Sequence, residues 1–379
     1  MSGEDANRPF VREELLPALA PPMQYRGVIG WLRAHLFINV LNSVLTLIVF
    51  AAIIYFVNVM WHFFFVNATF TGVAREDCLP NPGACYPYLK ANMGFFIYAF
   101  YPEPERWRVN IAALYSLLSI LALLWPSFPS RKLSAVNFFV LLPVIVFFLL
   151  YGGVFGLQVV ETYQWGGMIV TFVVAITGIV FSLPLGIFLA LGRRSKMAAI
   201  RMLSIVFIEV WRGVPLVTVL FMASIMLPLF LPSDMSPDKL LRALVGVTLF
   251  SSAYMAEVVR GGLQAIPKGQ YEAASALGLS YWQGMIFIVL PQALKKVIPG
   301  IVNTFIGLFK DTSLVFIVGL VDFLKAIDMS LVNPNWATPW TRYSGYAFGA
   351  LFYFICCWSM SRYSVYMENR LSAGENKKV

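Results

Sequence analysis

The sequence predicts an all-α polytopic membrane protein with about eight transmembrane helices. Of its 379 residues, 59% are hydrophobic and only 12% are charged, whereas soluble domains carry about 25% charged residues. The apolar residues also gather in runs close to the roughly 20 residues that a helix needs to cross a bilayer. Inside lipid such runs form helices, because the backbone must satisfy its own hydrogen bonds. We therefore expect a bundle of spanning helices in a lipid bilayer.

Eight apolar segments are candidate spans. The seventh is the shortest, and we expect it to extend at its N-terminal end. The segments are residues 36–60, 109–125, 133–151, 167–191, 206–231, 240–259, 298–309 and 343–366.

Basic residues mark one side of the membrane. Lys and Arg concentrate between spans two and three, four and five, and six and seven, and after the last span. Short basic loops stay in the cytoplasm, so we expect the N-terminal arm (residues 1–35) and the tail (residues 371–379) there too. The net charge of +9 fits this pattern better than a nucleic-acid-binding face. The first 34 residues lack the apolar core of a signal peptide, and we expect no cleavage.

The four cysteines give no metal-ligand spacing. Cys78 and Cys85 lie in the long outer loop, residues 61–108, where an oxidising compartment permits a disulfide. Two free thiols remain an equal alternative. Cys356 and Cys357 are adjacent in the last apolar run and are expected to pack among helices.

The chain divides near residue 155. Residues 36–155 hold three spans that are apolar and aromatic, and we expect no buried charge in them. Residues 156–370 hold five spans with charges inside them or at their edges, and charge inside a membrane is costly and usually functional. We therefore expect the working part of the protein in the second segment. The charges that lie within or at the edges of its spans are Glu209, Arg212, Glu257, Arg260, Lys310 and Asp311.

The segment between the sixth and seventh spans predicts two short helices at a membrane surface. Pro267 suits a first helical turn, and Gly278 suits the left-handed position that ends a helix. Ser280 and Gln283 have the spacing of a capping box for a second helix. Without further information, such a loop is an amphipathic connector in the interface.

The same segment resembles the signature of the membrane subunits of bacterial ABC importers, with no departure in spacing. The resemblance implies that the loop, residues 260–296, docks on a separate ATPase and couples ATP hydrolysis to the spans. No phosphate-binding loop of the Gly-x-x-x-x-Gly-Lys-Ser/Thr type occurs in the chain. We therefore expect no enzyme activity and no cofactor here, with ATP and Mg bound by a pair of ATPase subunits. The signature residues are Glu272, Ala273, Ala274, Gly278, Ile288, Leu290 and Pro291.

Further motifs resemble the polar amino-acid branch of these importers. They include Trp211-Arg212-Gly213-Val214-Pro215, Tyr254-Met255-Ala256-Glu257 and Lys310-Asp311-Thr312-Ser313. Three spans before a five-helix type I core resemble the eight-helix subunit of the general L-amino-acid transport system. This resemblance implies the inner membrane, a second related permease in a heterodimer rather than a homodimer, and a periplasmic amino-acid-binding protein.

Four polar residues are candidates for the substrate pathway. An amino acid needs a donor for its carboxylate, which the planar fork of Arg212 provides, and an acceptor for its ammonium, which Glu257 or Asp311 provides. Asn303 is a candidate polar helper. The alternatives are structural, because Arg212 can satisfy carbonyls freed at a helix break and Glu257 can pair with Arg260 on one helix face.

Two other functional classes compete with an importer subunit. A self-sufficient secondary transporter or channel would often show inverted repeats, and we find none. A membrane enzyme would need a nucleophile–base pair, a metal site or a cofactor motif, and none is evident in the sequence.

Overall fold

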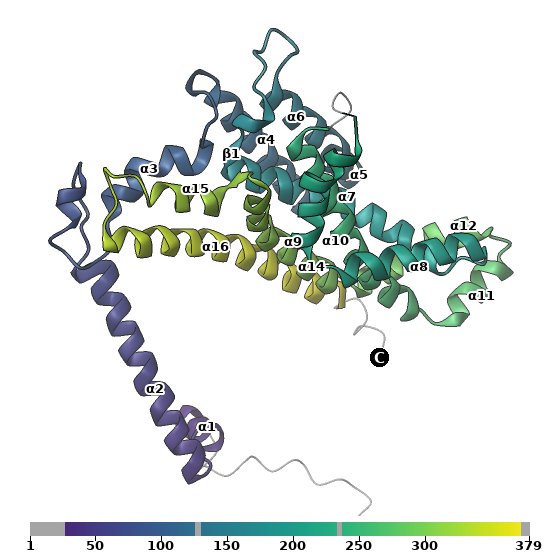
Figure 1. Ribbon diagram of the computed structural model, residues 1–379. Coiled ribbons are helices and arrows are strands. Elements are labelled where there is room, and N and C mark those ends of the chain that lie inside the picture. The colour runs from purple at the N-terminus through teal and green to yellow at the C-terminus, as the bar shows by residue number, and fades with distance from the viewer. Residues whose placement is uncertain (1–26, 126–129, 233–236, 373–379) are drawn as a thin grey trace, which may run out of the picture. The chain divides into compact units, whose positions relative to one another are not determined.

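The structure is a computed structural model, and it describes residues 27–125, 130–232 and 237–372. The chain forms two compact units that divide between Ala68 and Thr69. We describe each unit by itself (Figure 1).

The first unit contains α1 (Gly27–His35) and α2 (Val40–Trp61), and α2 continues into a π-helical turn, His62–Val66. The side chain of Asn39 caps α2 by accepting a hydrogen bond from the backbone N–H of Asn42. Together α2 and its extension are long and apolar enough to cross a membrane. A helix that is apolar on all sides is stable in lipid, so this part agrees with the first predicted span.

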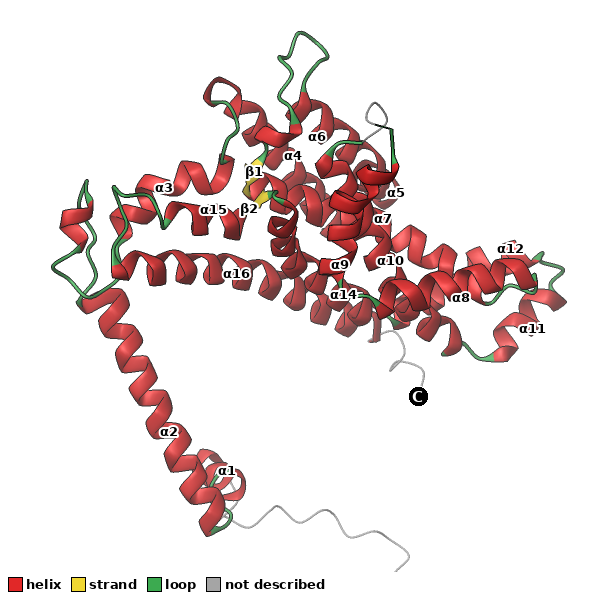
Figure 2. Cartoon of the chain, viewed as in Figure 1, coloured by secondary structure: helices red, strands yellow, loops and turns green. Residues whose placement is uncertain are grey.

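The second unit is almost entirely helical, as Figure 2 shows in red. Several helices continue into one another through π-helical turns, namely Asn137–Leu141, Met222–Met226 and Met285–Val289. The helices are α3 (Tyr86–Tyr98), α4 (Arg106–Leu124), α5 (Arg131–Val136), α6 (Leu142–Tyr151), α7 (Met168–Arg193), α8 (Ala198–Gly213), α9 (Leu216–Phe221), α10 (Lys239–Gln264), α11 (Lys268–Ala276), α12 (Tyr281–Gly284), α13 (Leu290–Lys296), α14 (Ile298–Asp311), α15 (Phe323–Ser330) and α16 (Pro339–Ser372).

Helices α7 and α10 form the most extensive helix pair of the unit. Gly186 of α7 lies against α10 so closely that an added Cβ would be 2.7 Å from the Cβ of Met255. Small residues at helix contacts are the usual means of close packing in membranes, where apolar burial itself provides little driving force. Glycine at this position therefore fixes the two central helices side by side.

Two short paired strands connect the start of α7 to the start of α15. β1 (Gly166–Gly167) and β2 (Val321–Asp322) pair in parallel, with Gly167 opposite Asp322. Gly167 has a positive φ of 62°, and an added Cβ would lie 2.4 Å from the carbonyl oxygen of Phe96 in α3. Helix α3, which lies within the loop expected at residues 61–108, thus packs against this junction and against α15 and α16.

The fifth predicted span is not one straight helix. α8 and the segment Leu216–Phe230 are separate helices that meet at an angle of 104°. The break follows Gly213, where Val214 is extended and Pro215 supplies no backbone N–H, so the α8 hydrogen-bond ladder stops. The candidate span over residues 206–231 is therefore broken near Gly213 and Pro215 rather than straight.

Six helical segments of the described residues have the length and composition of membrane spans, or seven when the bent pair is counted as one span. The eighth predicted span, residues 343–366, lies within the 34-residue α16, which is not among those candidates. The all-helical membrane fold is confirmed, and the count of eight stays a prediction.

The region before β1 contains a buried charge that the sequence interpretation did not expect. Arg108, in the first turn of α4, has no exposed surface. Its Nε lies 2.8 Å from a carboxylate oxygen of Glu105, and its Nη1 donates to the carbonyl oxygen of Gln158 at 2.9 Å. The expectation of no buried charge failed because Arg108 lies one residue outside the apolar run 109–125 but inside the helix that contains it.

The segment before α3 holds a disulfide between Cys78 and Cys85. Both cysteines are buried beside Tyr88 and Trp336, and the backbone N–H of Cys85 donates to the hydroxyl of Ser344. The segment is thereby attached to the N-terminal part of α16. Cys356 and Cys357 are half-buried free thiols of α16.

Candidate functional site

The segment with the signature residues folds as a helical hairpin, α11 and α12, at the opposite end of the second unit from α3 (Figure 1). α11 begins after Pro267 and ends at Ala276. Gly278 follows with φ of 75°, and the N–H of Leu279 donates to the carbonyl of Ala274 at 3.2 Å. A left-handed glycine with such bonds is the usual C-terminal cap of a helix.

The second helix begins with the predicted capping box. The backbone N–H of Gln283 donates to the Ser280 hydroxyl, and the backbone N–H of Ser280 donates to the side-chain oxygen of Gln283. Where the two helices meet, Ala274 is buried, and an added Cβ at Gly284 would lie 3.3 Å from its methyl group. The expected helix–cap–helix structure of this segment is confirmed.

The tip of the hairpin is exposed and apolar. Leu277 is 75% exposed, and the rings of Tyr281 and Trp282, both more than half exposed, lie edge to face with centroids 5.4 Å apart. Glu272 and Ala273, earlier in α11, are also exposed. Exposed aromatic groups with an apolar neighbour are typical of protein-binding surfaces.

The remaining signature residues lie on the return path to the bundle. Leu290 is half-buried and Pro291 exposed, and they form the first turn of α13. Pro291 follows the π-helical turn Met285–Val289, where the backbone hydrogen-bond pattern changes, as expected for a residue without a backbone N–H.

The base of the hairpin is attached to three helices of the bundle. Arg194, directly after α7, donates through Nη1 to the hydroxyl of Tyr271 at 2.9 Å and to the carbonyl of Leu263 in α10 at 3.1 Å. On another side, the amide of Gln292 in α13 donates to the side-chain oxygen of Gln270 at 3.0 Å. Thus the hydrogen bonds that attach α11 to the bundle lie in its N-terminal half.

A cluster of charged side chains joins α7, α8 and α10 close to that base. Glu257 is at its centre and is 17% exposed. Arg260 donates to both of its carboxylate oxygens, at 2.6 to 3.1 Å. Arg193 donates to Glu257 at 2.9 Å and to Glu209 at 3.0 Å, and Arg212 lies 3.7 Å from Glu257. We call these five residues the arginine cluster.

The structure brings together two of the four candidate pathway residues. Arg212 and Glu257 share the arginine cluster, and Arg212 also lies over the ring of Tyr254 at 5.5 Å. Asn303 and Asp311 belong to α14. Within the described residues neither has a hydrogen bond or ion pair to the cluster; Asn303 is exposed and Asp311 is half-buried.

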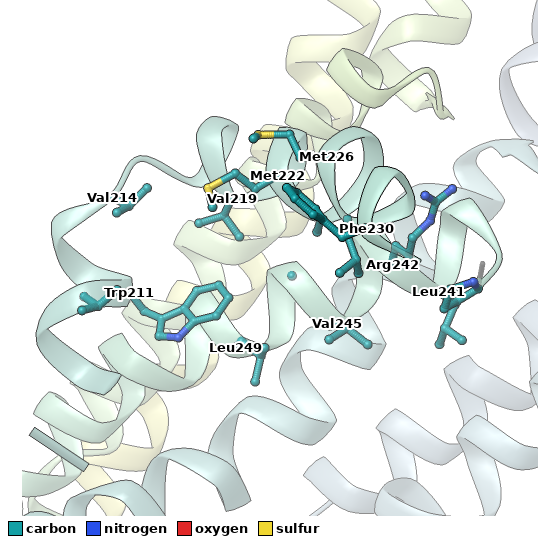
Figure 3. Close-up of a pocket in the computed structure, with 15 residues that line it drawn as sticks. Trp211, Val214, Val219, Met222, Met226, Phe230, Leu241, Arg242, Val245 and Leu249 are labelled. Carbon is teal, nitrogen blue, oxygen red and sulfur yellow. The ribbon is translucent and has the colours of Figure 1, made fainter. Parts of the chain in front are cut away.

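An apolar cavity of about 550 Å³ lies between the bent pair and α10 (Figure 3). Trp211, in the last turn of α8, and Phe230 reach toward the cavity. Arg242 lies at its other end, and the guanidinium of Arg242 donates to the carbonyl of Ser224 at 2.8 Å. Its lining comprises Val210, Trp211, Val214, Val219, Met222, Ala223, Met226, Leu227, Phe230, Pro237, Leu241, Arg242, Val245, Gly246 and Leu249.

Residues 182–373, half of the chain, match the family model described as the binding-protein-dependent transport system inner membrane component. The chain belongs to this family. It is 51% identical over 344 residues to the inner membrane amino-acid ABC transporter permease protein YhdY of Escherichia coli (strain K12), covering 91% of this chain and 93% of the relative. The chain is thus a permease of the amino-acid ABC transporter type.

A second relative also matches this permease over nearly all of its length. The glutamate/glutamine/aspartate/asparagine transport system permease protein BztC of Rhodobacter capsulatus is 36% identical over 428 residues, covering 96% of this chain and 98% of the relative. A solved structure described as an amino acid ABC transporter with histidines is 28% identical, with 54% of this chain and 92% of that chain covered and a TM-score of 0.47.

Sequence reasoning did not find Arg193, Arg194 and Tyr271 as parts of the permease's candidate site. The two arginines entered the sequence interpretation only as basic residues of a loop. Tyr271 directly precedes the signature residue Glu272 and was given no role. Their partners are 16 to 77 residues away along the chain, so only the folded structure shows the pairing. One available signal was the pair of adjacent arginines at the end of an apolar run, since cations at a helix C-terminus are favoured.

Proposed function

We propose that this permease is the membrane-spanning subunit of an ATP-driven importer that carries L-amino acids, polar and of broad range, from periplasm to cytoplasm. The amino-acid transporter type of the family supports the cargo class. The name of BztC, a permease for glutamate, glutamine, aspartate and asparagine, supports the range. On this proposal residues 156–370 are the five-helix type I core and residues 36–155 are an addition.

One observation carries the coupling proposal: a hairpin that is anchored at its base and bare at its apolar tip. An exposed tip of Leu277, Tyr281 and Trp282 would be costly in water and suits burial in a groove of another protein. Glu272, Ala273, Ala274 and Gly278 would shape the docking helix, with Leu290-Pro291 returning it to the bundle. The abundance of Lys and Arg near this end favours a cytoplasmic position for it, and for both termini, in the inner membrane.

The proposed assembly has further members. A pair of ATPase subunits would hold ATP and Mg, since this chain has no phosphate-binding loop. A second, related permease would complete a heterodimer, and a periplasmic amino-acid-binding protein would deliver the cargo. The surrounding partner is the lipid bilayer, and no nucleic acid is involved.

The contacts of the arginine cluster refine the proposed roles along the substrate pathway. Glu257 already receives hydrogen bonds from Arg193 and Arg260, so its role is to orient arginines rather than to accept a substrate ammonium. The cluster holds three arginines and two carboxylates, which leaves donors of Arg212 for a substrate carboxylate. Asp311 and Asn303 of α14 remain the proposed polar contacts for the rest of the amino acid.

The test of coupling is Gly278→Asp in the complete importer. The change adds a side chain where φ is positive and a charge at the docking turn, so we expect ATP-driven uptake to be abolished while the protein stays in the membrane. Gly269→Asp is a matched control, because Gly269 lies in the first turn of α11, where a carboxylate is favourable. Unimpaired uptake in the Gly278→Asp importer would refute the coupling role.

The alternative function, a self-sufficient secondary transporter or channel, has its own test. Proteoliposomes containing this chain and no ATPase would be given an ion gradient and labelled amino acid. We expect no uptake. Gradient-driven uptake would favour the alternative, although the exposed tip of the hairpin would then have no role.

A further inference from the structure

We propose that Arg194 is a positioning residue that transfers movement of the α11–α12 hairpin to α7 and α10 through Tyr271. The proposal rests on the proposed coupling function and adds the path by which the docking hairpin acts on the spans. We call the contact of Arg194, Leu263 and Tyr271 the Arg194 junction.

The Arg194 junction joins three elements at one point. The Tyr271 hydroxyl accepts from Arg194 at 2.9 Å and donates to the Leu263 carbonyl at 3.3 Å, and Arg194 donates to the same carbonyl at 3.1 Å. The guanidinium also lies 5.4 Å from the centre of the Tyr271 ring. Because the three groups bond to one another, a displacement of α11 pulls on the ends of both α7 and α10.

The hairpin is suited to pass a push from its tip to this junction. Its two helices are closed against each other by Ala274 and Gly284 and by the capping box at Ser280. A stiff hairpin behaves as one body, so force on the exposed tip reaches the base. Within the described residues the base has two hydrogen-bonded side-chain attachments to the bundle, the Arg194 junction and the pair Gln270–Gln292.

Space beside the junction allows it to change. A depression of about 460 Å³ is lined by Arg194, Leu263, Gln264, Ile266, Lys268, Tyr271 and Glu272. Arg194 itself is exposed, so its bonds are exchanged with water at low cost. A contact that must form and break during each cycle needs this accessibility, whereas a sealed contact would resist it.

The neighbouring residue extends the path to the candidate substrate site. Arg193, one position before Arg194, is bound to Glu209 of α8 and Glu257 of α10. The C-terminal end of α7 therefore holds the arginine cluster through Arg193, and the next residue, Arg194, holds the hairpin. Movement of the hairpin thus reaches Arg212 through Arg194, Arg193 and Glu257 in turn.

Two conservative variants isolate the junction. Tyr271→Phe keeps the ring but removes both hydroxyl bonds. Arg194→Lys keeps the charge but replaces the guanidinium, whose Nη1 donates to both partners and which lies over the Tyr271 ring, with an ammonium on a different stem. Matched controls are Tyr163→Phe and Arg201→Lys, whose side chains are exposed and make no polar contact within the described residues.

The experiment uses the whole importer in proteoliposomes and measures uptake, ATP hydrolysis and co-purification of the ATPase subunits. We expect solute moved per ATP to fall about five- to tenfold in either junction variant, the scale of a single intramolecular hydrogen bond, with the ATPase still bound. The double variant is expected to lose no more than the worse single variant.

The outcomes separate this proposal from the coupling proposal. An unchanged ratio of solute moved to ATP hydrolysed in Tyr271→Phe overturns the proposed role of Arg194 and leaves the coupling proposal standing. Loss of the ATPase from the variants also overturns it, because the junction would then shape the docking surface rather than transmit movement. If the wild-type chain itself binds no ATPase, the proposed function fails first.

Discussion

Arginine serves two regions of the second unit in different ways. Arg108 is fully enclosed, and its partners are Glu105, directly before α4, and the backbone carbonyl of Gln158 in a loop. Arg193, Arg212 and Arg260 are 24 to 35% exposed and share the carboxylate of Glu257 across three helices. We call the buried pair of Arg108 and Glu105 the closed bond, and the three arginines that share the Glu257 carboxylate the open network.

The difference indicates which charges hold the fold and which serve transport. A buried ion pair whose partner is removed leaves an uncompensated charge in low dielectric, so it tolerates little movement. A partly exposed network with surplus donors keeps water nearby and can exchange partners when helices shift. The first suits a fixed frame, and the second suits helices that must move during each transport cycle.

The largest expected effect concerns the closed bond. Arg108→Ala leaves Glu105 and the Gln158 carbonyl without their partner, and we expect a loss of stability of about 3–5 kcal/mol. Arg106→Ala is the matched control on the same helix turn, because the Arg106 pair with Glu103 is exposed and such pairs contribute up to about 1 kcal/mol. Thermal unfolding in detergent measures both, and equal shifts would remove the distinction between the two regions.

The next effect concerns the open network and falls on transport. Glu257→Gln removes the charge that orients three arginines, and we expect uptake to drop about tenfold, the scale of one charge-assisted hydrogen bond, with ATPase assembly intact. Glu209→Gln is the control, because Glu209 has one arginine partner and is 55% exposed; its effect is expected to be smaller. Wild-type uptake kinetics in Glu257→Gln would make the cluster structural.

The parts of the site whose contacts join residues close together along the chain were predictable from the sequence, and the parts whose contacts join distant residues were not. The hairpin was predictable from residues 266–291 because Pro267, Gly278 and the Ser280–Gln283 box act on their immediate neighbours along the chain. The arginine cluster was predictable only in part. The spacing of Glu257 and Arg260 indicates a pair on one helix face, but nothing local assigns Arg193 or Arg212 to the same carboxylate.

The fold shows the same limit. Long apolar runs predicted the spanning helices, because lipid permits little else. The 104° bend of α8 and α9 was foreseen only as a weakness at Gly213 and Pro215, since its angle depends on packing with α10. α3 was missed inside a long polar and aromatic segment, because it is held by α15 and α16 far along the chain.

The central claim, that the tip of the hairpin docks on an ATPase, has a direct test by cross-linking. Leu277→Cys, in a chain with Cys356→Ser and Cys357→Ser, would be labelled with a maleimide that carries a photoreactive group, within the assembled importer. Val332→Cys, 78% exposed in the segment between α15 and α16, is the control. The account predicts a cross-link to the ATPase subunit from position 277 and none from position 332. The absence of that product from position 277, with the ATPase still bound to the complex, would contradict it.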